Sequence, residues 1–121
     1  MEHQLLMFRL NNVHFGIETK SVKEILRLKE ATLYEMPKAP KDILGLITLR
    51  GAVYPVLDRC IEPVKRNEKD ARILIIEVNL VTIGLVVDEV VSYLSGDEFK
   101  MRSENEVDVI DYQILEVDML F

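Results

Sequence analysis

Cysteine and histidine are scarce in this 121-residue sequence, and tryptophan is absent. The single cysteine, Cys60, excludes an internal disulfide and suits a reducing compartment, so we expect a cytoplasmic protein. No apolar run approaches the roughly 20 residues that a membrane-spanning helix needs, and no signal peptide opens the chain. The net charge of −6 makes a nucleic-acid backbone an unfavourable partner. We therefore expect an acidic globular domain that neither inserts into a membrane nor binds nucleic acid.

Motifs for catalysis and cofactor binding are also missing. The sequence contains no glycine-rich dinucleotide loop, no phosphate-binding loop and no nucleophile elbow. His3 and His14 are the only histidines, and Cys60 has no histidine at ligand spacing, so we expect no metal site and no cofactor. Acidic residues at 88–89 and 104–108 could pair as acid and base, but such neighbours are expected by chance among 21 acidic residues. The sequence thus predicts a protein that is not an enzyme.

Short runs rich in valine, isoleucine and leucine make up most of the chain. These runs follow one another closely, and the segments that join them are only as long as hairpin turns. This spacing favours antiparallel barrels or sandwiches over βαβ units, so we predict a mainly β fold. A polar stretch over 62–70 is the clearest linker. The predicted strands cover residues 4–10, 13–17, 31–36, 43–49, 52–57, 72–78, 81–87, 90–94, 107–110 and 112–117.

Residues 19–29 have a different period. Val22, Ile25 and Leu26 fall at positions i, i+3 and i+4, with charged residues between them. This spacing predicts a short amphipathic helix over 19–29. Val22 and Ile25 on its apolar side are expected in the core more than at an interface.

Two segments repeat within the chain. Residues 8–26 align with residues 76–94 at an offset of 68 and pair Asn11 with Asn79 and Gly16 with Gly84. A weaker match sets 47–61 over 107–121. The repeat predicts two intertwined β subdomains with an apolar seam between them, inside one domain that spans residues 1–121.

The step Arg50-Gly51 lies between two apolar runs and reads as a tight turn. A turn needs glycine, asparagine or aspartate, so turn formation does not account for an arginine. Arginine is favoured at protein–protein contacts, and we predict that Arg50 touches a partner. Gly45, inside the first run, indicates either a bend or a close approach of other backbone.

Several segments together resemble the CheW family, the coupling proteins of bacterial chemotaxis. The run Ile43 to Gly51 is similar to the family's strand that ends in Asn-Leu-Arg-Gly, with Thr48 in the place of the usual asparagine. The other matching segments are Phe8-Arg-Leu with Phe15-Gly-Ile-Glu18, Val22-Lys-Glu-Ile25, Met36-Pro37 to Pro40, Val53-Tyr-Pro-Val-Leu-Asp58 and Gly84-Leu-Val-Val-Asp88-Glu-Val.

This resemblance implies two intertwined five-stranded SH3-like β-barrel subdomains with one or two short helices. It also implies a non-catalytic adaptor that binds the regulatory domain of a CheA-type histidine kinase and the cytoplasmic hairpin tip of chemoreceptors. The kinase contacts are not assigned to residues. Receptor contacts are expected at Val22, Gly45, Leu49, Arg50 and Val53.

The sequence departs from the family pattern in its last third. The stretch 97–106 is shorter than the family's usual loop, and the chain stops at Phe121, where members generally continue into a final helix. We therefore expect Met119, Leu120 and Phe121 to be exposed or covered by another chain.

Two other functions stay open at this point. One is a small ligand-binding β-barrel domain, which would need a deep pocket with converging polar groups. The other is a CheW-like adaptor in a different kinase pathway, such as twitching motility.

Overall fold

The computed structural model describes residues 4–60 and 65–95, and the backbone of residues 112–114. Within these residues the fold is mainly β, as predicted. Two three-residue 3₁₀ helices interrupt the strands, η1 (Thr19–Ser21) and η2 (Leu28–Glu30). The strands are β1 (Gln4–Leu10), β2 (Val13–Glu18), β3 (Val22–Arg27), β4 (Ile43–Leu49), β5 (Ala52–Leu57), β6 (Arg72–Val78), β7 (Val81–Val87), β8 (Glu89–Ser95) and β9 (Tyr112–Ile114).

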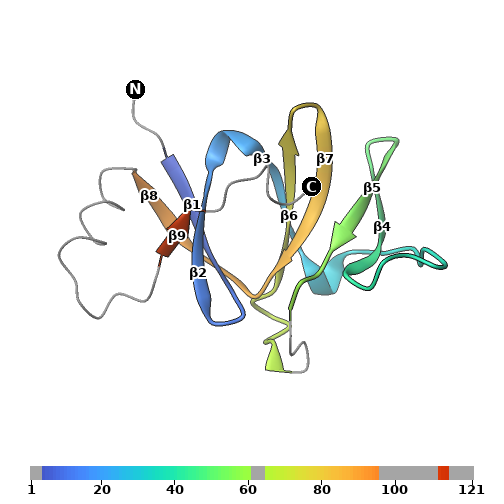
Figure 1. The fold of residues 1–121 in the computed structure, drawn as a ribbon, viewed down its shortest axis with the longest axis horizontal. Helices are drawn as coiled ribbons and strands as arrows, with labels where there is room; N and C mark the ends of the chain where they lie inside the picture. Colours follow the sequence, from blue (N-terminus) through green and yellow to red (C-terminus); the bar gives the residue numbers. More distant parts are fainter. Residues whose placement is uncertain (1–3, 61–64, 96–111, 115–121) are drawn as a thin grey trace.

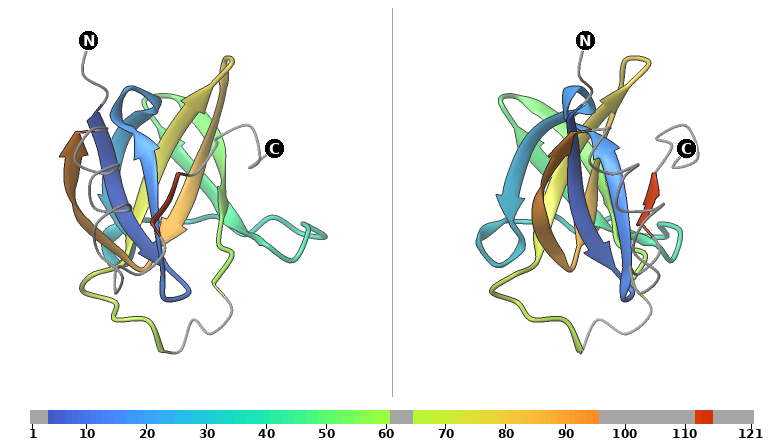
Figure 2. Two further views of the ribbon diagram at one scale, coloured as in Figure 1. Left: turned by 60° about the vertical axis from the view of Figure 1, so that its left-hand side comes forward. Right: turned by 90° about the vertical axis from the view of Figure 1, so that its left-hand side faces the viewer.

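The strands form two sheets that lie side by side (Figure 1). One sheet has the order β8-β1-β2-β9 and the other the order β3-β6-β7-β5-β4. In Figure 2, where the left side of Figure 1 faces the viewer, the four-stranded sheet stands in front of the five-stranded one. Two sheets are therefore confirmed. Within the described residues neither sheet closes into a barrel, because β3 and β4 remain the edges of the five-stranded sheet.

The strand pairings follow the internal repeat. The hairpin β1–β2 is followed by β3, which pairs with β6; the hairpin β6–β7 is followed by β8, which pairs with β1. The two pairings have the same register at an offset of 68. Val22 lies opposite Ile76 as Val90 lies opposite Phe8, and both ladders then skip one residue, position 23 in β3 and position 91 in β8. The strand that follows each hairpin thus pairs with the other hairpin.

The second, weaker repeat has a different offset from the predicted one of 60. β5 runs parallel to β7 with Val56 opposite Gly84, and β9 runs parallel to β2 with Ile114 opposite Gly16. Because Gly16 and Gly84 are equivalent, Val56 corresponds to Ile114, an offset of 58. The sequence agrees once shifted, since Tyr54-Pro-Val-Leu-Asp58 then aligns with Tyr112-Gln-Ile-Leu-Glu116.

The largest buried cluster lies between the two sheets and draws equivalent residues from both halves. Leu6 and Leu74 are equivalent in the repeat, as are Ile17 and Leu85, and all four belong to this cluster. Burying such apolar side chains is the main favourable contribution to folding, so the two halves depend on each other for stability. The full cluster comprises Leu6, Phe8, Leu10, Ile17, Leu57, Leu74, Ile76, Ile83, Leu85 and Val87.

The predicted helix over 19–29 is wrong. Residues 22–27 form β3, whose side chains alternate between half-buried and exposed, and only the flanking residues are helical, in η1 and η2. The β3–β6 ladder skips Lys23, so that Val22 and Ile25 border one hollow and Leu26 packs on the cluster inside the five-stranded sheet; this arrangement matches the apolar spacing of a helix. Pairing with β6, far away in sequence, decides the conformation, and the β-branched Val22 and Ile25 suit a strand.

Two further strand predictions need correction or lie outside the described residues. The predicted strand 31–36 is reduced to a single bridge between Tyr34 and Leu46, in a loop that projects from the sheet (Figure 1). Of the predicted final hairpin, the strand at 112–117 is described only as β9, and the strand at 107–110 lies outside the described residues. The stretch 97–106 and the ending at Met119 to Phe121 also lie outside them.

Candidate partner-binding surface

Arg50 occupies the tip of the β4–β5 hairpin. Leu49 lies opposite Ala52, so the turn has two residues, and both have positive φ: 48° at Arg50 and 82° at Gly51. This is the geometry of a type I′ turn, which glycine adopts without strain and arginine does not. The Arg50 side chain is 81% exposed, and its Nη1 donates a hydrogen bond to Oε2 of Glu24 on β3 at 3.0 Å. The hairpin tip is thus tied to the opposite edge of the same sheet by one exposed ion pair.

The other predicted receptor-contact residues lie in three different environments. Val53 is 59% exposed on the outer face of β5. Leu49 and Val22 are half-buried; Leu49 packs on the cluster inside the five-stranded sheet, and Val22 packs on the cluster between the sheets. The structure therefore leaves Arg50 and Val53 as the members of the predicted set with the most accessible side chains.

Gly45 is buried, and its environment gives an internal reason for glycine. A Cβ at this position would lie 2.8 Å from the backbone oxygen of Tyr34, closer than such contacts occur. Tyr34 and Leu46 exchange two backbone hydrogen bonds of 2.8 Å, which pin the loop before β4 onto that strand. Gly45 therefore permits the close approach of another segment of the same chain.

A hollow of about 220 Å³ lies beside the Arg50–Glu24 pair. Strands β3, β4, β5, β6 and β7 all contribute to it. Its lining consists of Lys23, Glu24, Leu49, Arg50, Tyr54, Ile75, Glu77 and Thr82.

A second hollow of about 290 Å³ lies on the other side of β3, at the seam between the sheets. Ile25 and Tyr93, which are equivalent in the repeat, border it and are 36% and 55% exposed. It shares Lys23 and Glu24 with the first hollow, so the two form one surface that crosses β3. Its lining consists of Leu6, Thr19, Val22, Lys23, Glu24, Ile25 and Tyr93.

Sequence reasoning did not place Tyr93 at this surface, and it expected Ile25 in the core. The available signal was the repeat itself, which aligns Ile25 with Tyr93. Once the third strands are exchanged, two equivalent outward-facing positions lie on either side of the seam. This geometry is visible only after strand pairing is known.

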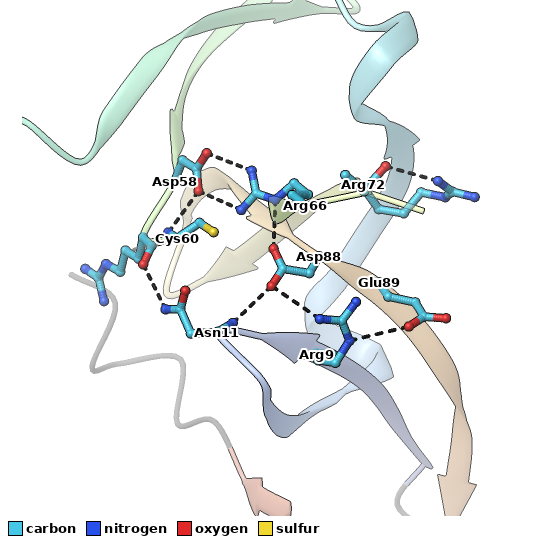
Figure 3. Close-up of polar contacts among 10 residues, drawn as sticks. Arg9, Asn11, Asp58, Cys60, Arg66, Arg72, Asp88 and Glu89 are labelled. Carbon is cyan, nitrogen blue, oxygen red and sulfur yellow. Dashed lines mark hydrogen bonds and ion pairs between the residues drawn. The ribbon is translucent and has the colours of Figure 1, made fainter. Parts of the chain in front are cut away.

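A buried ion network lies at the opposite end of the strands and was also missed (Figure 3). The Arg66 side chain, 5% exposed, donates from Nη1 and Nη2 to both carboxylate oxygens of Asp58 at 2.9 Å, and from Nε to Asp88 at 2.7 Å. Asp88 also accepts from the backbone N–H of Asn11 at 3.0 Å, and Arg9 lies 3.7 Å from it. Two-point binding of a carboxylate by a guanidinium is among the stronger hydrogen-bonding arrangements.

The strand order explains how this network forms. Asp58 follows the end of β5 and Asp88 follows the end of β7, and these two strands are parallel neighbours, so their carboxyl ends meet at one edge. Burial lowers the pKa of Arg66, and its hydrogen bonds with Asp58 and Asp88 raise the pKa by more than burial lowers it. The pKa of Arg66 therefore lies above the ordinary arginine value. Arg66 therefore stays charged and links the polar segment after residue 64 to both sheets.

The described residues contain no group of three histidine, cysteine or acidic side chains that could hold a metal ion. Among the same residues, no helix is long and apolar enough to cross a membrane. A third hollow, of about 390 Å³, lies between β3 and β4 and is bordered by the Arg27–Glu30 ion pair.

Comparison with known proteins gives consistent results. The sequence model of a protein family, the CheW-like domain, matches residues 4–115 of this chain. A probable chemotaxis protein CheW from Rhizobium etli is 35% identical over 97 residues, which cover 78% of this chain and 61% of the relative. Chemotaxis protein CheW from Bacillus subtilis is 29% identical over 85% of this chain and 67% of the relative.

A solved structure is also similar. The scaffolding protein TtCheW from Thermoanaerobacter tengcongensis superposes with a TM-score of 0.68 and 28% identity, over 82% of this chain and 65% of that one. The chain spans about three fifths of the length of the Rhizobium relatives that it matches.

Proposed function

This chain belongs to the CheW-like domain family, and on that premise we propose that it is a non-catalytic adaptor in bacterial chemotaxis signalling. It couples the cytoplasmic hairpin tip of a chemoreceptor to the regulatory domain of a CheA-type histidine kinase in the cytoplasm. The observation that carries the proposal is the exposed Arg50, which lines one hollow and pairs with Glu24, a residue that lines both hollows. We further propose that the two sheets correspond to two five-stranded SH3-like barrels.

We propose that the receptor meets the molecule at the Arg50 turn and along β3. Arg50 supplies a cation at the hairpin tip, and Val53 supplies an exposed apolar contact beside it. Leu49 and Val22 shape the floors of the two hollows. Gly45 acts by holding β4 in place through the bridge to Tyr34.

The proposed mechanism is coupling between two binding events. A change in the receptor tip alters how the adaptor holds the kinase and thereby shifts an equilibrium between kinase states. Coupling free energies between sites are typically about 1–3 kcal/mol, enough to change activity several-fold. The ion network of Arg66 supports such coupling because it joins β1 of one sheet to β5 and β7 of the other.

Small-ligand binding is less well supported. The two hollows at β3 are bordered by side chains that are themselves exposed, Arg50 and Tyr93. Of the two cations that line the hollows, Arg50 already pairs with Glu24, and Lys23 is exposed to solvent. A site for a small molecule needs enclosing walls and converging polar groups that are free to bind it.

The test is the charge reversal Arg50→Glu. An exposed ion pair contributes at most about 1 kcal/mol, so the free energy of unfolding should change little. Binding of a soluble receptor hairpin fragment, measured by calorimetry, should fall below detection because the contact cation becomes an anion beside Glu24.

The matched control is Glu24→Gln, which removes the ion pair and keeps the cation. It should retain receptor binding within a few-fold. If Arg50→Glu binds the receptor fragment like the natural chain, this surface is not the receptor contact. A large loss of stability in Arg50→Glu would instead make Arg50 a structural residue.

A further inference from the structure

The β6–β7 hairpin carries an apolar side chain in an unfavourable position. Asn79 and Leu80 form its two-residue turn with φ of 52° and 70°. Leu80 is 94% exposed, so its side chain contributes almost nothing to the folded core. Residues with a branched side chain avoid the left-handed region, which asparagine and glycine tolerate. The Leu80 side chain therefore makes no evident contribution to the stability of the fold.

The other half of the molecule shows what the turn itself requires. Asn11 and Asn12 form the equivalent turn of the β1–β2 hairpin, with φ of 54° and 63°. Asn12 thus occupies the position of Leu80 in nearly the same backbone conformation. An asparagine satisfies this turn, so leucine at position 80 calls for a reason outside the turn. Backbone strain and exposed apolar groups without a structural purpose concentrate at functional sites.

Leu80 has apolar neighbours at the same end of the five-stranded sheet. Val81 follows it and is 47% exposed. In the described residues β5 pairs with β7 at Val56 with Gly84 and at Leu57 with Leu85, so Val53 and Val81 both lie three residues before the paired positions, on adjacent strands. Leu80 and Val81 therefore form an exposed apolar set at the β6–β7 turn, and Val53 is exposed on the neighbouring hairpin.

This set adjoins the surface proposed to bind the receptor. Glu77 and Thr82, which pair with each other just inside the β6–β7 turn, line the 220 Å³ hollow together with Leu49 and Arg50. The ends of both hairpins lie at the same side of the molecule in Figure 1. A partner that covers Arg50 and the 220 Å³ hollow would therefore also lie close to the β6–β7 turn that carries Leu80.

We propose that Leu80, supported by Val81, is an apolar anchor for the same chemoreceptor segment that contacts Arg50. The proposal rests on the function proposed above and adds to it a second hairpin and a recognition rule. The receptor segment must carry an apolar side chain that covers Leu80, near an acidic side chain that pairs with Arg50. Leucine in the strained turn is then retained for binding, at the expense of stability.

The substitution Leu80→Asn tests this directly, because it gives the second turn the residue of the first. Removing a left-handed leucine should raise the melting temperature by a few degrees. Affinity for a soluble receptor hairpin fragment, measured by calorimetry with the full chain, should fall about tenfold, the size expected for loss of one apolar anchor. A residue with only a structural role would not produce a more stable and weaker-binding protein.

Two control variants test whether the loss of binding is specific to an apolar side chain at position 80. Leu80→Met keeps an apolar side chain and should bind within about twofold of the natural chain, because methionine fills apolar contacts adaptably. Met36→Asn removes an exposed apolar side chain from the loop before β4 and should leave receptor binding unchanged.

The other outcomes each overturn a defined part of the proposal. If Arg50→Glu abolishes binding and Leu80→Asn does not weaken it, the anchor is wrong and the proposed function stands. If Arg50→Glu also binds normally, or the natural chain does not bind the receptor fragment, the proposed receptor surface fails and the anchor with it. A lower melting temperature for Leu80→Asn would make Leu80 structural. Loss of a dimer by Leu80→Asn in sedimentation would assign the contact to a second copy of the chain.

Discussion

The two equivalent hairpin turns of this molecule share a backbone conformation and differ in their surroundings. The first turn, Asn11-Asn12, is held from inside: the backbone N–H of Asn11 donates to Asp88, and its side-chain Nδ2 donates to the backbone oxygen of Arg59. The second turn carries Leu80, which is almost fully exposed. Similar turns thus have different surroundings: one joins the two sheets, and the other, we propose, faces a partner.

The two ends of the five-stranded sheet differ in how far their charged side chains are exposed to solvent. At the end where β5 and β7 finish, the half-buried Asp58 and the buried Asp88 are bound by Arg66. At the end where both strands begin, Arg50 and Leu80 project into solvent. One end therefore contributes stability, and the other end carries the surface that we propose for recognition.

The largest effect is expected from Arg66→Ala, which would break the internally held end. Removing the guanidinium leaves the half-buried Asp58 and the buried Asp88 close together without the cation that joins them. Breaking a buried ion pair in this way typically costs about 3–5 kcal/mol. Urea denaturation should show a loss of that order in the free energy of unfolding.

Arg72→Ala is the matched control for this variant. Arg72 donates from Nη1 to the backbone oxygens of Lys69 and Ala71, and it pairs with neither Asp58 nor Asp88 in the part of the chain that the structure describes. Its loss should cost about 1 kcal/mol, as expected for hydrogen bonds near the surface. Equal losses for the two variants would show that the Arg66 network does not hold this end together.

The two equivalent glycines provide a smaller and sharper test of the comparison. An added Cβ at Gly84 would lie 3.0 Å from methyl carbons of both Ile73 and Val56, which are fully buried. At Gly16 it would lie 3.0 Å from the sulfur of Met7, and a thioether can move aside. Gly84→Ala should therefore cost about 2 kcal/mol and Gly16→Ala less than about 1 kcal/mol.

Thermal unfolding of both alanine variants checks this prediction. The result matters because Gly16 and Gly84 lie at corresponding places in the repeat, each opposite a parallel strand. The reverse order of stabilities would mean that the half around Met7 is packed more rigidly than the half around Val56.

The smallest effect is expected from Asn12→Leu, which gives the first turn the residue of the second. A leucine in the left-handed region should cost about 1 kcal/mol relative to asparagine. The melting temperature should fall, whereas it should rise for Leu80→Asn. If both variants shift it in the same direction, the two turns are not equivalent in energy.

Much of the fold could be predicted because the strands and hairpins are encoded locally. The pairs Asn11-Asn12, Arg50-Gly51 and Asn79-Leu80 separate apolar runs, and each is a two-residue turn in the structure. Turn residues and β-branched runs carry this information within a few positions, so no distant contact is needed to interpret them.

The conformation of residues 22–27 could not be obtained from their own pattern. Their spacing fits a helix, and pairing with β6 converts them into a strand. The internal repeat indicates a strand here, because it aligns Val22 to Leu26 with Val90 to Leu94, a segment that the sequence predicts as a strand. Similarity between two segments was here a better guide than the periodicity of one.

The site was predicted in part for the same reason. Arg50 is distinctive in sequence because turn formation does not explain it. Arg66 lies among other charged residues in a polar stretch, and no local signal marks it as buried. Its role depends on β5 and β7 being parallel neighbours, which brings Asp58 and Asp88 to one edge. Long-range pairing of this kind is absent from any short window of sequence.

We propose that this chain holds two partners at once on separate surfaces. To test this, the full chain is mixed with a soluble chemoreceptor hairpin fragment and a CheA-type kinase regulatory domain, and the complexes are followed by sedimentation velocity. We expect a ternary complex, and we expect Arg50→Glu to leave only the binary complex with the kinase domain. Failure to bind either protein, or mutual exclusion of the two, would overturn the proposed adaptor function.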